Sequence, residues 1–317
     1  MAAWPRQPAP IVLTGPTAAG KTAVAVALAE RLQGEIVNAD SMQVYRSMDI
    51  GTAKPSPDER QRAPFHLLDL VTPDLLFSVS EWKERAEAAI MDIAARERRP
   101  IVCGGTGLYI KALLESWSLA ATPADPEVRS ALKAEAERSG APALHARLQT
   151  VDAFTAARLH PNDAVRIVRA LEVYQVTGQP ISAFQRRDQE ARAPRPAVRL
   201  ALTLPRAELY ARIEARVERM IGEGLEDEAR RLLDQGYSPT LGPLRSLGYK
   251  EMIAYLCGET DRTTAIANIK LETRRFAKRQ LTWFRADPDL LWFDVSAQDS
   301  AAVAQRLHAY LHERGAL

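Results

Sequence analysis

A complete phosphate-binding motif lies near the start of the 317-residue sequence. Residues 15–22 read GPTAAGKT and match G-x-x-x-x-G-K-[ST], directly after the apolar run Ile11–Thr14 and before a helical stretch, which is the context that this motif requires. The backbone N–H groups of such a loop face the ligand, and the helix N-terminus adds partial positive charge. Lys21 adds a mobile cation, and the Thr22 hydroxyl can bind Mg²⁺. The motif therefore predicts a polyphosphate site made of Gly15, Pro16, Thr17, Ala18, Ala19, Gly20, Lys21 and Thr22.

Two further loops with polar residues or glycine follow predicted strands. VNADSMQVY places Asp40 after one strand, and CGGTGLY places Gly104–Gly107 after another. Because the C-terminal ends of parallel strands form one edge of a sheet, where ligands bind, we expect Asp40, Thr106 and Lys21 to meet in one pocket. Asp40 is interpreted either as a turn cap or as a metal ligand or general base beside the phosphates. The glycines indicate either a tight turn or a backbone that passes close to a ligand.

The motif leaves the class of protein open. A small-molecule or nucleoside kinase that uses ATP would place an aspartate at the end of an apolar strand, and Asp69 in HLLDL is the contender. Because Asp69 also suits an ordinary strand end, the kinase interpretation is incomplete. A non-catalytic RNA-binding module gated by a nucleotide is a further class.

Strand and helix signals alternate over the first 118 residues. Four apolar runs predict strands, at Ile11–Thr14, Ile36–Ala39, His66–Val71 and residues 101–105. Lys21–Gln33 predicts a helix that stops at Gly34, and a capping box at Ser78 and Glu81 opens a second helix that runs to about Arg99. Strands that alternate with helices predict a parallel α/β sheet.

The pattern changes near Ser118. Residues 121–196 give helix signals and no good strand, whereas residues 198–205 and 290–295 predict strands again, and Glu208–Gln235 has helical periodicity. We therefore predict an α/β protein with a P-loop NTPase-like parallel sheet flanked by helices, formed by residues 1–120 and 197–317. Residues 121–196 form an inserted all-helical domain.

Composition indicates the cellular compartment but does not indicate whether the protein binds nucleic acid. The net charge is +2 with 26% charged residues, which neither requires nor excludes nucleic acid. Cys103 and Cys257 lie far apart and form no CxxC pair, which favours a reducing compartment, and the five histidines show no zinc-site spacing with them. No stretch approaches 18 apolar residues. We expect a cytoplasmic protein without a membrane partner, for which a monomer is adequate.

Five motifs together resemble a known family. GPTAAGKT, NADSMQVYRSMDIGTAKP, GGTGLY, HPNDAVRIVRALEV and RSLGYKE occur in the order seen in tRNA dimethylallyltransferase, the tRNA isopentenyltransferase of bacteria. The match runs from about Ile11 to Arg285. It implies transfer of a dimethylallyl group from dimethylallyl diphosphate to N6 of adenosine 37 in the tRNA anticodon loop, with release of diphosphate. The phosphate loop would then hold the diphosphate of an allylic donor.

The resemblance also implies roles for individual residues. Lys21, together with Mg²⁺ on Thr22, would neutralise the leaving diphosphate, and Asp40 would accept the proton of the adenine amine. Thr106 would assist at the diphosphate, and Arg216 would lie near it. The adenine must leave the base stack to reach the pocket. Its recognition would fall to Asp40, Ser41, Met42, Gln43 and Thr106.

The remaining implied tRNA contacts lie in the helical insertion and in RSLGYKE: Arg129, Val165, Arg166, Ile167, Val168, Arg169, Arg245, Tyr249 and Lys250. Arg166 and Arg169 share one helix face. The residues alone favour a solvated surface paired with Asp163 or Glu172, whereas the resemblance favours phosphate contact. Val165 stands where the family often has glutamine, which puts one polar contact in doubt.

Residues 273–285, TRRFAKRQLTWFR, combine five basic side chains with three aromatic ones. This mixture suits a single-stranded RNA loop, which binds through phosphate attraction and base stacking. It suits equally well a helix with aromatic core residues and a solvated basic face. Both interpretations stay open.

Overall fold

The computed structural model describes residues 4–5, 9–117, 124–190 and 194–316. The chain divides into two compact units. Met1–Leu114 and Arg195–Leu317 form the first, here called the sheet unit, and Glu115–Pro194 form the second, here called the helical unit.

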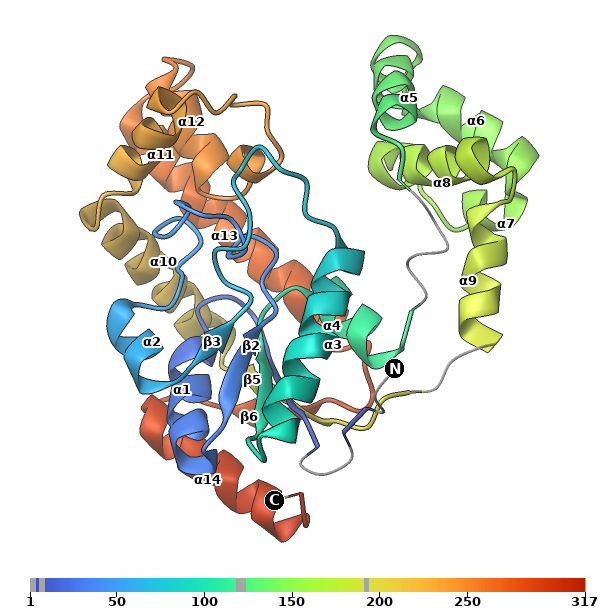
Figure 1. Ribbon diagram of the computed structural model, residues 1–317. Coiled ribbons are helices and arrows are strands. Elements are labelled where there is room, and N and C mark those ends of the chain that lie inside the picture. The colour runs from blue at the N-terminus through green and yellow to red at the C-terminus, as the bar shows by residue number, and fades with distance from the viewer. Residues whose placement is uncertain (1–3, 6–8, 118–123, 191–193, 317) are drawn as a thin grey trace. The chain divides into compact units, whose positions relative to one another are not determined.

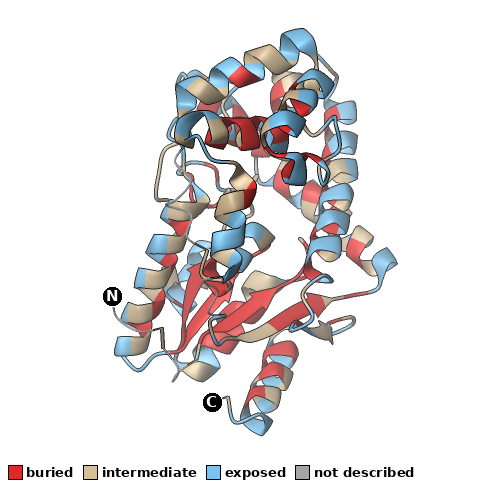
Figure 2. Cartoon of the chain, turned by 90° about the vertical axis from the view of Figure 1, so that its right-hand side faces the viewer, coloured by how far each residue is buried: buried red, intermediate tan, exposed pale blue. Residues whose placement is uncertain are grey.

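The sheet unit is built on a parallel sheet with the strand order β3-β2-β4-β1-β5-β6 (Figure 1). The strands are β1 (Ile11–Thr14), β2 (Glu35–Asn38), β3 (Phe65–His66), β4 (Pro100–Cys103), β5 (Val198–Thr203) and β6 (Leu291–Asp294). All residues of β1, β2 and β4 are buried (Figure 2), because helices cover both faces of a parallel sheet. The predicted α/β fold with a parallel sheet flanked by helices is confirmed.

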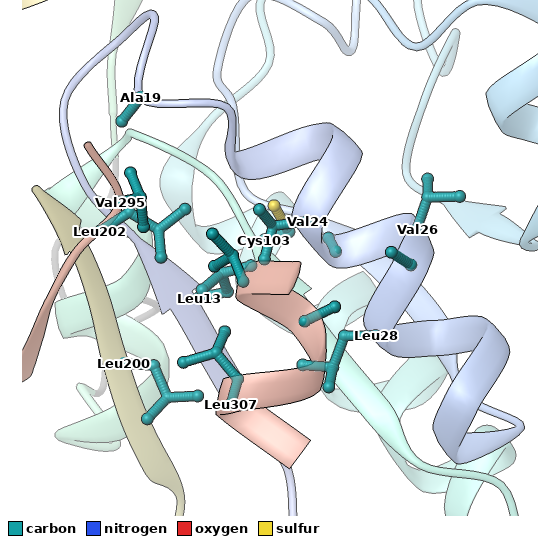
Figure 3. Packing of buried hydrophobic residues seen from close by; sticks show 14 of the residues in the cluster. Leu13, Ala19, Val24, Val26, Leu28, Cys103, Leu200, Leu202, Val295 and Leu307 are labelled. Carbon is teal, nitrogen blue, oxygen red and sulfur yellow. The ribbon is translucent and has the colours of Figure 1, made fainter. Parts of the chain in front are cut away.

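Alternate residues of β1 enter two different cores. Leu13 packs with Leu200 and Leu202 of β5 against α1 (Lys21–Leu32) and α14 (Ser300–Glu313), as Figure 3 shows. Val12 faces the opposite core, with α3 (Val79–Ala95) and α4 (Gly107–Leu114). There the Trp82 indole stacks on the Tyr109 ring with centroids 4.4 Å apart. Its Nε1 donates to the Asn38 carbonyl at 2.9 Å, which anchors the end of β2 two residues before Asp40.

A third core supports the loop that follows β2. Val44 and Met48 of this loop pack with residues of α10 (Arg206–Gly222), α11 (Leu225–Asp234), α12 (Tyr249–Leu256) and α13 (Arg262–Phe284). The short helix α2 (Pro57–Arg62) and a 3₁₀ turn at Pro243–Arg245 complete the helices of the described part of this unit.

Two predicted elements differ because single residues adopt positive φ. The predicted strand His66–Val71 is a strand only at Phe65–His66, with a single further bridge from Val71 to Tyr45, because Leu67 and Asp69 have φ of 66° and 55° and interrupt the extended chain. The predicted helix Glu208–Gln235 is two helices, because Gly224 has φ of 99° and ends the first.

Two helix ends also differ. The left-handed residue at the end of α1 is Gln33, with φ of 49°, and not Gly34. A Cβ on Gly34 would lie 2.7 Å from the Arg99 carbonyl oxygen, so this glycine serves close packing instead. Helix α3 has the predicted capping box at Ser78 and Glu81 but ends at Ala95, four residues before Arg99.

The described residues of the helical unit form only helices: α5 (Pro126–Ser139), α6 (Ala141–Val151), α7 (Ala153–Ala156), α8 (Ala164–Thr177) and α9 (Ile181–Glu190). Leu132, Leu148, Ile167 and Leu171 form the centre of its core. Asp163 caps α8 by accepting from the Arg166 N–H at 3.2 Å. In neither unit do the described residues contain a helix with the length and apolar character of a membrane span.

Candidate active site

A pocket of about 1510 Å³ opens at the carboxyl ends of β1, β2 and β4. The phosphate loop and the first turn of α1 supply one wall, the loop after β2 a second and the turn after β4 a third, and residues of α2, α10 and α13 together with Asp69 complete the lining. The residues that line the pocket include Thr17, Lys21, Thr22, Asp40, Gln43, Asp69, Cys103, Gly104, Gly105, Arg212, Arg216, Arg219, Phe276 and Gln280. All of them belong to the sheet unit.

The phosphate loop depends on close approach to β5. Gly15 has φ of 138°, and a Cβ there would lie 2.5 Å from the Leu202 carbonyl oxygen, so no other residue fits. The Lys21 ammonium reaches back across the loop and donates to the Pro16 carbonyl at 2.8 Å. One loop amide departs from the prediction that the N–H groups face the ligand, because the Thr17 N–H donates to Gln280 Oε1 at 2.7 Å.

The pocket concentrates positive charge around Lys21. Burial, chiefly, lowers the pKa of Lys21 to about 8, with a smaller lowering from the Arg216 guanidinium and an opposing effect of the Asp40 carboxylate. Burial likewise lowers the pKa of Arg216, and Asp40 again opposes it. Lys21, Asp40 and Arg216 all line this pocket, as the sequence predicts for Asp40 and Lys21. Two cations in one pocket favour an anionic ligand.

We expect the affinity of this pocket for inorganic pyrophosphate to fall above pH 8. Lys21 is charged below a pKa of about 8 and neutral above it, so the dissociation constant should rise by up to about tenfold per pH unit there. Isothermal titration calorimetry from pH 7 to 9.5 measures this. The Lys21→Arg variant is the control, because arginine stays charged throughout this range. An identical pH dependence in both proteins would contradict the assignment to Lys21.

Asp40 makes the turn-cap contact that the sequence left open and also lines the pocket. Its Oδ1 accepts from the Met42 N–H at 2.9 Å, so the carboxylate does cap a turn. The same side chain lines the pocket. The Asn38 side-chain amide holds the strand end by donating to the Leu67 carbonyl at 3.2 Å. The cap thus orients a carboxylate that is still accessible from the pocket.

Thr106 supports the Asp40 loop from behind. Its hydroxyl accepts from the Ser41 N–H at 3.0 Å, and its own N–H donates to the Ala39 carbonyl at 3.1 Å. Thr106 is absent from the residues that line the pocket. Lys21 and Asp40 therefore both line the pocket, whereas Thr106 lies behind the lining residues and holds the Ser41 N–H.

The glycines of the turn after β4 are required by the protein itself. A Cβ would lie 2.2 Å from the Ala39 carbonyl oxygen at Gly104, 2.3 Å from Gln280 Nε2 at Gly105 and 2.2 Å from Trp283 Cδ1 at Gly107. Gly104 and Gly105 also line the pocket, but the close approach that excludes a side chain is to β2 and α13. The close packing of a tight turn is therefore present, and contact of these glycines with a ligand stays a prediction.

A buried carboxylate that the sequence reasoning missed shapes the loop after β2. Glu228 of α11 accepts the N–H groups of Asp49, Ile50 and Gly51 at 3.0, 2.9 and 3.0 Å, and the Tyr249 hydroxyl at 2.5 Å. Only the position of Glu228 in the apolar stripe of α11, beside the buried Leu225, Ala229 and Leu232, could have indicated it. Within the same loop, the Gln43 amide donates to the Thr52 and Ala53 carbonyls, both at 3.1 Å.

Three residues predicted to contact tRNA have side chains in a core. Tyr249 is 0% exposed, and its hydroxyl bonds to Glu228, so its side chain supports the loop after β2 and is not exposed for contact with tRNA. Ile167 and Val168 are buried in the core of the helical unit, which likewise excludes side-chain contact. Arg245 and Lys250, which flank Tyr249, are exposed.

The predicted basic residues of the helical unit form local ion pairs. Arg166 is 69% exposed and pairs with Asp163 at 3.0 Å. Arg169 and Arg129 both pair with the fully buried Glu172, at 3.0 and 2.9 Å. Val165, next to Arg166, is 82% exposed. The pairing with Asp163 and Glu172 that the residues alone favoured is therefore present, and it leaves Arg166 as the more accessible cation of α8.

Asp69, the contender for the carboxylate of a kinase, is already engaged. It pairs with Lys54 at 2.5 Å and with Arg60 at 3.0 Å. Burial would raise the pKa of Asp69, but the bonds from Lys54 and Arg60 outweigh burial and lower it. A carboxylate held by two cations is poorly suited to bind a metal ion, which weakens the kinase interpretation.

Comparison with known proteins agrees with this geometry. The family model described as IPP transferase matches residues 43–287. The tRNA dimethylallyltransferase of Geobacter metallireducens is 52% identical over 285 residues, which cover 90% of this chain and 92% of that protein. The solved tRNA isopentenylpyrophosphate transferase of Bacillus halodurans is 40% identical, with a TM-score of 0.71 over 96% of this chain and 95% of that one. A eukaryotic dimethylallyltransferase solved while acting on tRNA is 26% identical, with a TM-score of 0.79 over 96% of this chain and 79% of that one. The chain therefore belongs to the IPP transferase family.

Proposed function

We propose that this protein transfers the dimethylallyl group of dimethylallyl diphosphate to N6 of adenosine 37 in the anticodon loop of tRNA and releases diphosphate. The single observation that carries the proposal is the pocket that Lys21, Arg216 and Asp40 line together. The two cations suit a leaving diphosphate, and the carboxylate suits an amine that must lose a proton. Relatives that are named tRNA dimethylallyltransferases support the same reaction.

The leaving group is the first half of the chemistry. As the bond between the allylic carbon and the diphosphate oxygen breaks, negative charge grows on the diphosphate, and Lys21, Arg216 and the remaining loop amides stabilise it. Loss of the leaving group gives the allylic carbon cationic character. Because Lys21 and Arg216 both line the pocket, both are available to stabilise this growing charge.

A divalent cation fits beside Lys21. The described residues contain no group of three or more histidine, cysteine, aspartate or glutamate side chains that could hold a metal, whereas the Thr22 side chain lies on the pocket wall. Mg²⁺ is commonly held by one or two protein oxygens, phosphate oxygens and water, and Thr22 would be its protein ligand here. When bound, Mg²⁺ would neutralise further charge on the diphosphate.

The acceptor is the second half. The adenine N6 amine is a poor nucleophile, because its lone pair is delocalised into the ring. Asp40 accepts a proton from this amine as the new carbon–nitrogen bond forms, and its cap contact with Met42 keeps the carboxylate in place. Ser41 and Gln43 lie next to Asp40 and are proposed to contact the base that leaves the stack.

The tRNA is proposed to contact exposed basic residues of both units. Arg245 and Lys250 are exposed in the sheet unit, and Arg166 is exposed in the helical unit. Helix α13 adds exposed basic side chains. Of its aromatic residues, Phe284 is 3% exposed and belongs to the core, whereas Phe276 and Trp283 are 36% and 43% exposed. The core interpretation and the surface interpretation of residues 273–285 therefore each apply to part of the helix. Exposed aromatic rings beside cations suit unstacked RNA bases.

The Arg166→Ala change should weaken tRNA binding and reduce its salt dependence. The ion pair between Arg166 and Asp163 is exposed, and such pairs contribute at most about 1 kcal/mol, so a phosphate can displace Asp163. Loss of one phosphate contact should reduce the slope of log K against log salt by about 1. Filter binding from 50 to 300 mM KCl measures the slope. Arg31→Ala, an exposed arginine in the last turn of α1, is the control, and an unchanged slope for Arg166→Ala would exclude this contact.

The reaction itself is tested with Mg²⁺, dimethylallyl diphosphate and unmodified tRNA. Diphosphate release that depends on tRNA supports the proposal. A parallel reaction contains ATP and nucleosides, and phosphoryl transfer in the absence of tRNA would support a kinase instead. We also propose that the protein acts as a monomer in the cytoplasm, where tRNA is found.

A further inference from the structure

We propose that Gln280 of α13 is a positioning residue that holds the phosphate loop and the 104–107 turn at a set distance from each other. The Gln280 side chain is 6% exposed. Its Oε1 accepts from the Thr17 N–H at 2.7 Å, and its Nε2 donates to the Gly105 carbonyl at 3.0 Å. The inference rests on the proposed prenyl transfer and assigns a role in that reaction to a residue outside the motif loops.

Only a side-chain amide of this length satisfies both bonds. Thr17 offers a donor and Gly105 offers an acceptor, so the bridging group must accept at one atom and donate at another. A glutamate keeps the acceptor for Thr17 but cannot donate to Gly105, and a methionine can make neither hydrogen bond. Asparagine is shorter by one methylene group and cannot span the same gap.

The surrounding packing keeps the amide in this place. The position that a Cβ on Gly105 would occupy lies 2.3 Å from Gln280 Nε2 and 3.8 Å from the Lys21 ammonium, so the amide and the ammonium meet at the same point of the turn. One helical turn further on, the Trp283 indole fills the space beside Gly107, with Cδ1 2.2 Å from the position of a Cβ. Gln280 and Trp283 are three residues apart and share one face of α13.

A continuous series of contacts connects the two halves of the chemistry through Gln280. Thr17 belongs to the loop proposed to hold the diphosphate. Gly105 precedes Thr106, whose hydroxyl holds the Ser41 N–H beside Asp40. The length of the Gln280 amide therefore sets the distance between the leaving group and the proposed base. A misplacement of about 1 Å between reacting groups costs on the order of 10²-fold in rate.

Three variants test this role: Gln280→Met, Gln280→Glu and the control Asn268→Ala. Asn268 is an exposed side-chain amide of the same helix and lies outside the basic stretch 273–285. For Gln280→Met we expect kcat to fall by roughly 10- to 100-fold, with weaker binding of inorganic pyrophosphate and an unchanged KM for tRNA. Gln280→Glu should bind pyrophosphate more weakly than Gln280→Met, because its carboxylate lies beside Lys21 and repels the anion. Asn268→Ala should match the wild type.

A double-mutant cycle between Gly105 and Gln280 tests the contact between the two residues, in addition to the loss of the Gln280 amide. In Gly105→Ala the new methyl group displaces the amide, so kcat should fall as in Gln280→Met. The double variant Gly105→Ala/Gln280→Ser removes the clash, and its loss should be smaller than the product of the losses in the single variants Gly105→Ala and Gln280→Ser. Multiplicative losses would overturn the proposal.

The remaining outcomes separate this inference from the proposed function. If kcat and pyrophosphate affinity of Gln280→Met stay within about twofold of wild type, the inference fails while tRNA-dependent diphosphate release still stands. A lowered melting temperature with unchanged kcat, measured below the transition, would also overturn it. If the wild type releases no diphosphate with tRNA, the proposed function fails, and pyrophosphate binding still decides whether Gln280 shapes the loop.

Discussion

The Asp40→Asn change is expected to lower kcat by roughly 10²- to 10⁴-fold, the range of a lost general base, while the affinity for tRNA stays within about twofold of wild type. Asparagine has nearly the same shape as aspartate and can still accept from the Met42 N–H that Asp40 caps at 2.9 Å. It cannot accept the proton of the adenine amine. The change therefore removes the proposed base and keeps the cap. Single-turnover rates with saturating tRNA and dimethylallyl diphosphate measure the effect.

Two further variants separate the base from the cap. Asp40→Ala removes both the base and the cap. Its kcat should equal that of Asp40→Asn, or fall further where the loop loses order. Asp294→Asn is the matched control, because Asp294 accepts from the N–H two residues ahead, Ser296, at 2.8 Å in the same way but does not line the pocket. Wild-type turnover in Asp40→Asn combined with a loss in Asp40→Ala would reduce Asp40 to a structural cap.

The Lys21→Met change is expected to lower kcat/KM for dimethylallyl diphosphate by roughly 10²- to 10³-fold, as for the loss of one preorganised charge-stabilising group. Lys21 is the cation of the phosphate loop, and its only hydrogen bond given by the described structure is to the Pro16 carbonyl. A diphosphate would replace that contact. Methionine fills a similar volume without charge, so the growing charge of the leaving group would lose its nearest cation.

Stability should move in the opposite direction. Because burial lowers the pKa of Lys21 to about 8, the charged form is disfavoured in the folded protein, and a neutral side chain removes this cost. The melting temperature of Lys21→Met at pH 7 should therefore equal or exceed that of the wild type. Lys21→Arg, which keeps the charge, should recover part of the activity. An activity loss accompanied by a clear drop in melting temperature would instead indicate a structural role for Lys21.

Local signals in the sequence predicted the elements that carry the phosphate site. The loop 15–22 lies between β1 and α1 in the structure, and the capping box at Ser78 and Glu81 begins α3. Both are interactions within one short segment, so the residue types alone specify them. The parallel sheet followed from the alternation of apolar runs with helices. The predicted strand His66–Val71 is interrupted by the positive φ of Leu67 and Asp69, which no local pattern of residue types indicated.

The sequence by itself thus determined the phosphate loop, the position of Asp40 at a strand end and the fold class, because each depends on neighbours along the chain. The tertiary structure alone decided which side chains support them. Gln280 accepts a hydrogen bond from Thr17, 263 residues away in the sequence, and Glu228 accepts three from N–H groups about 178 residues away. Tyr249 lies within a motif that suggested an exposed surface, yet it is buried against Glu228. Burial and hydrogen bonding between distant segments are properties of packing, and no local pattern of residue types encodes them.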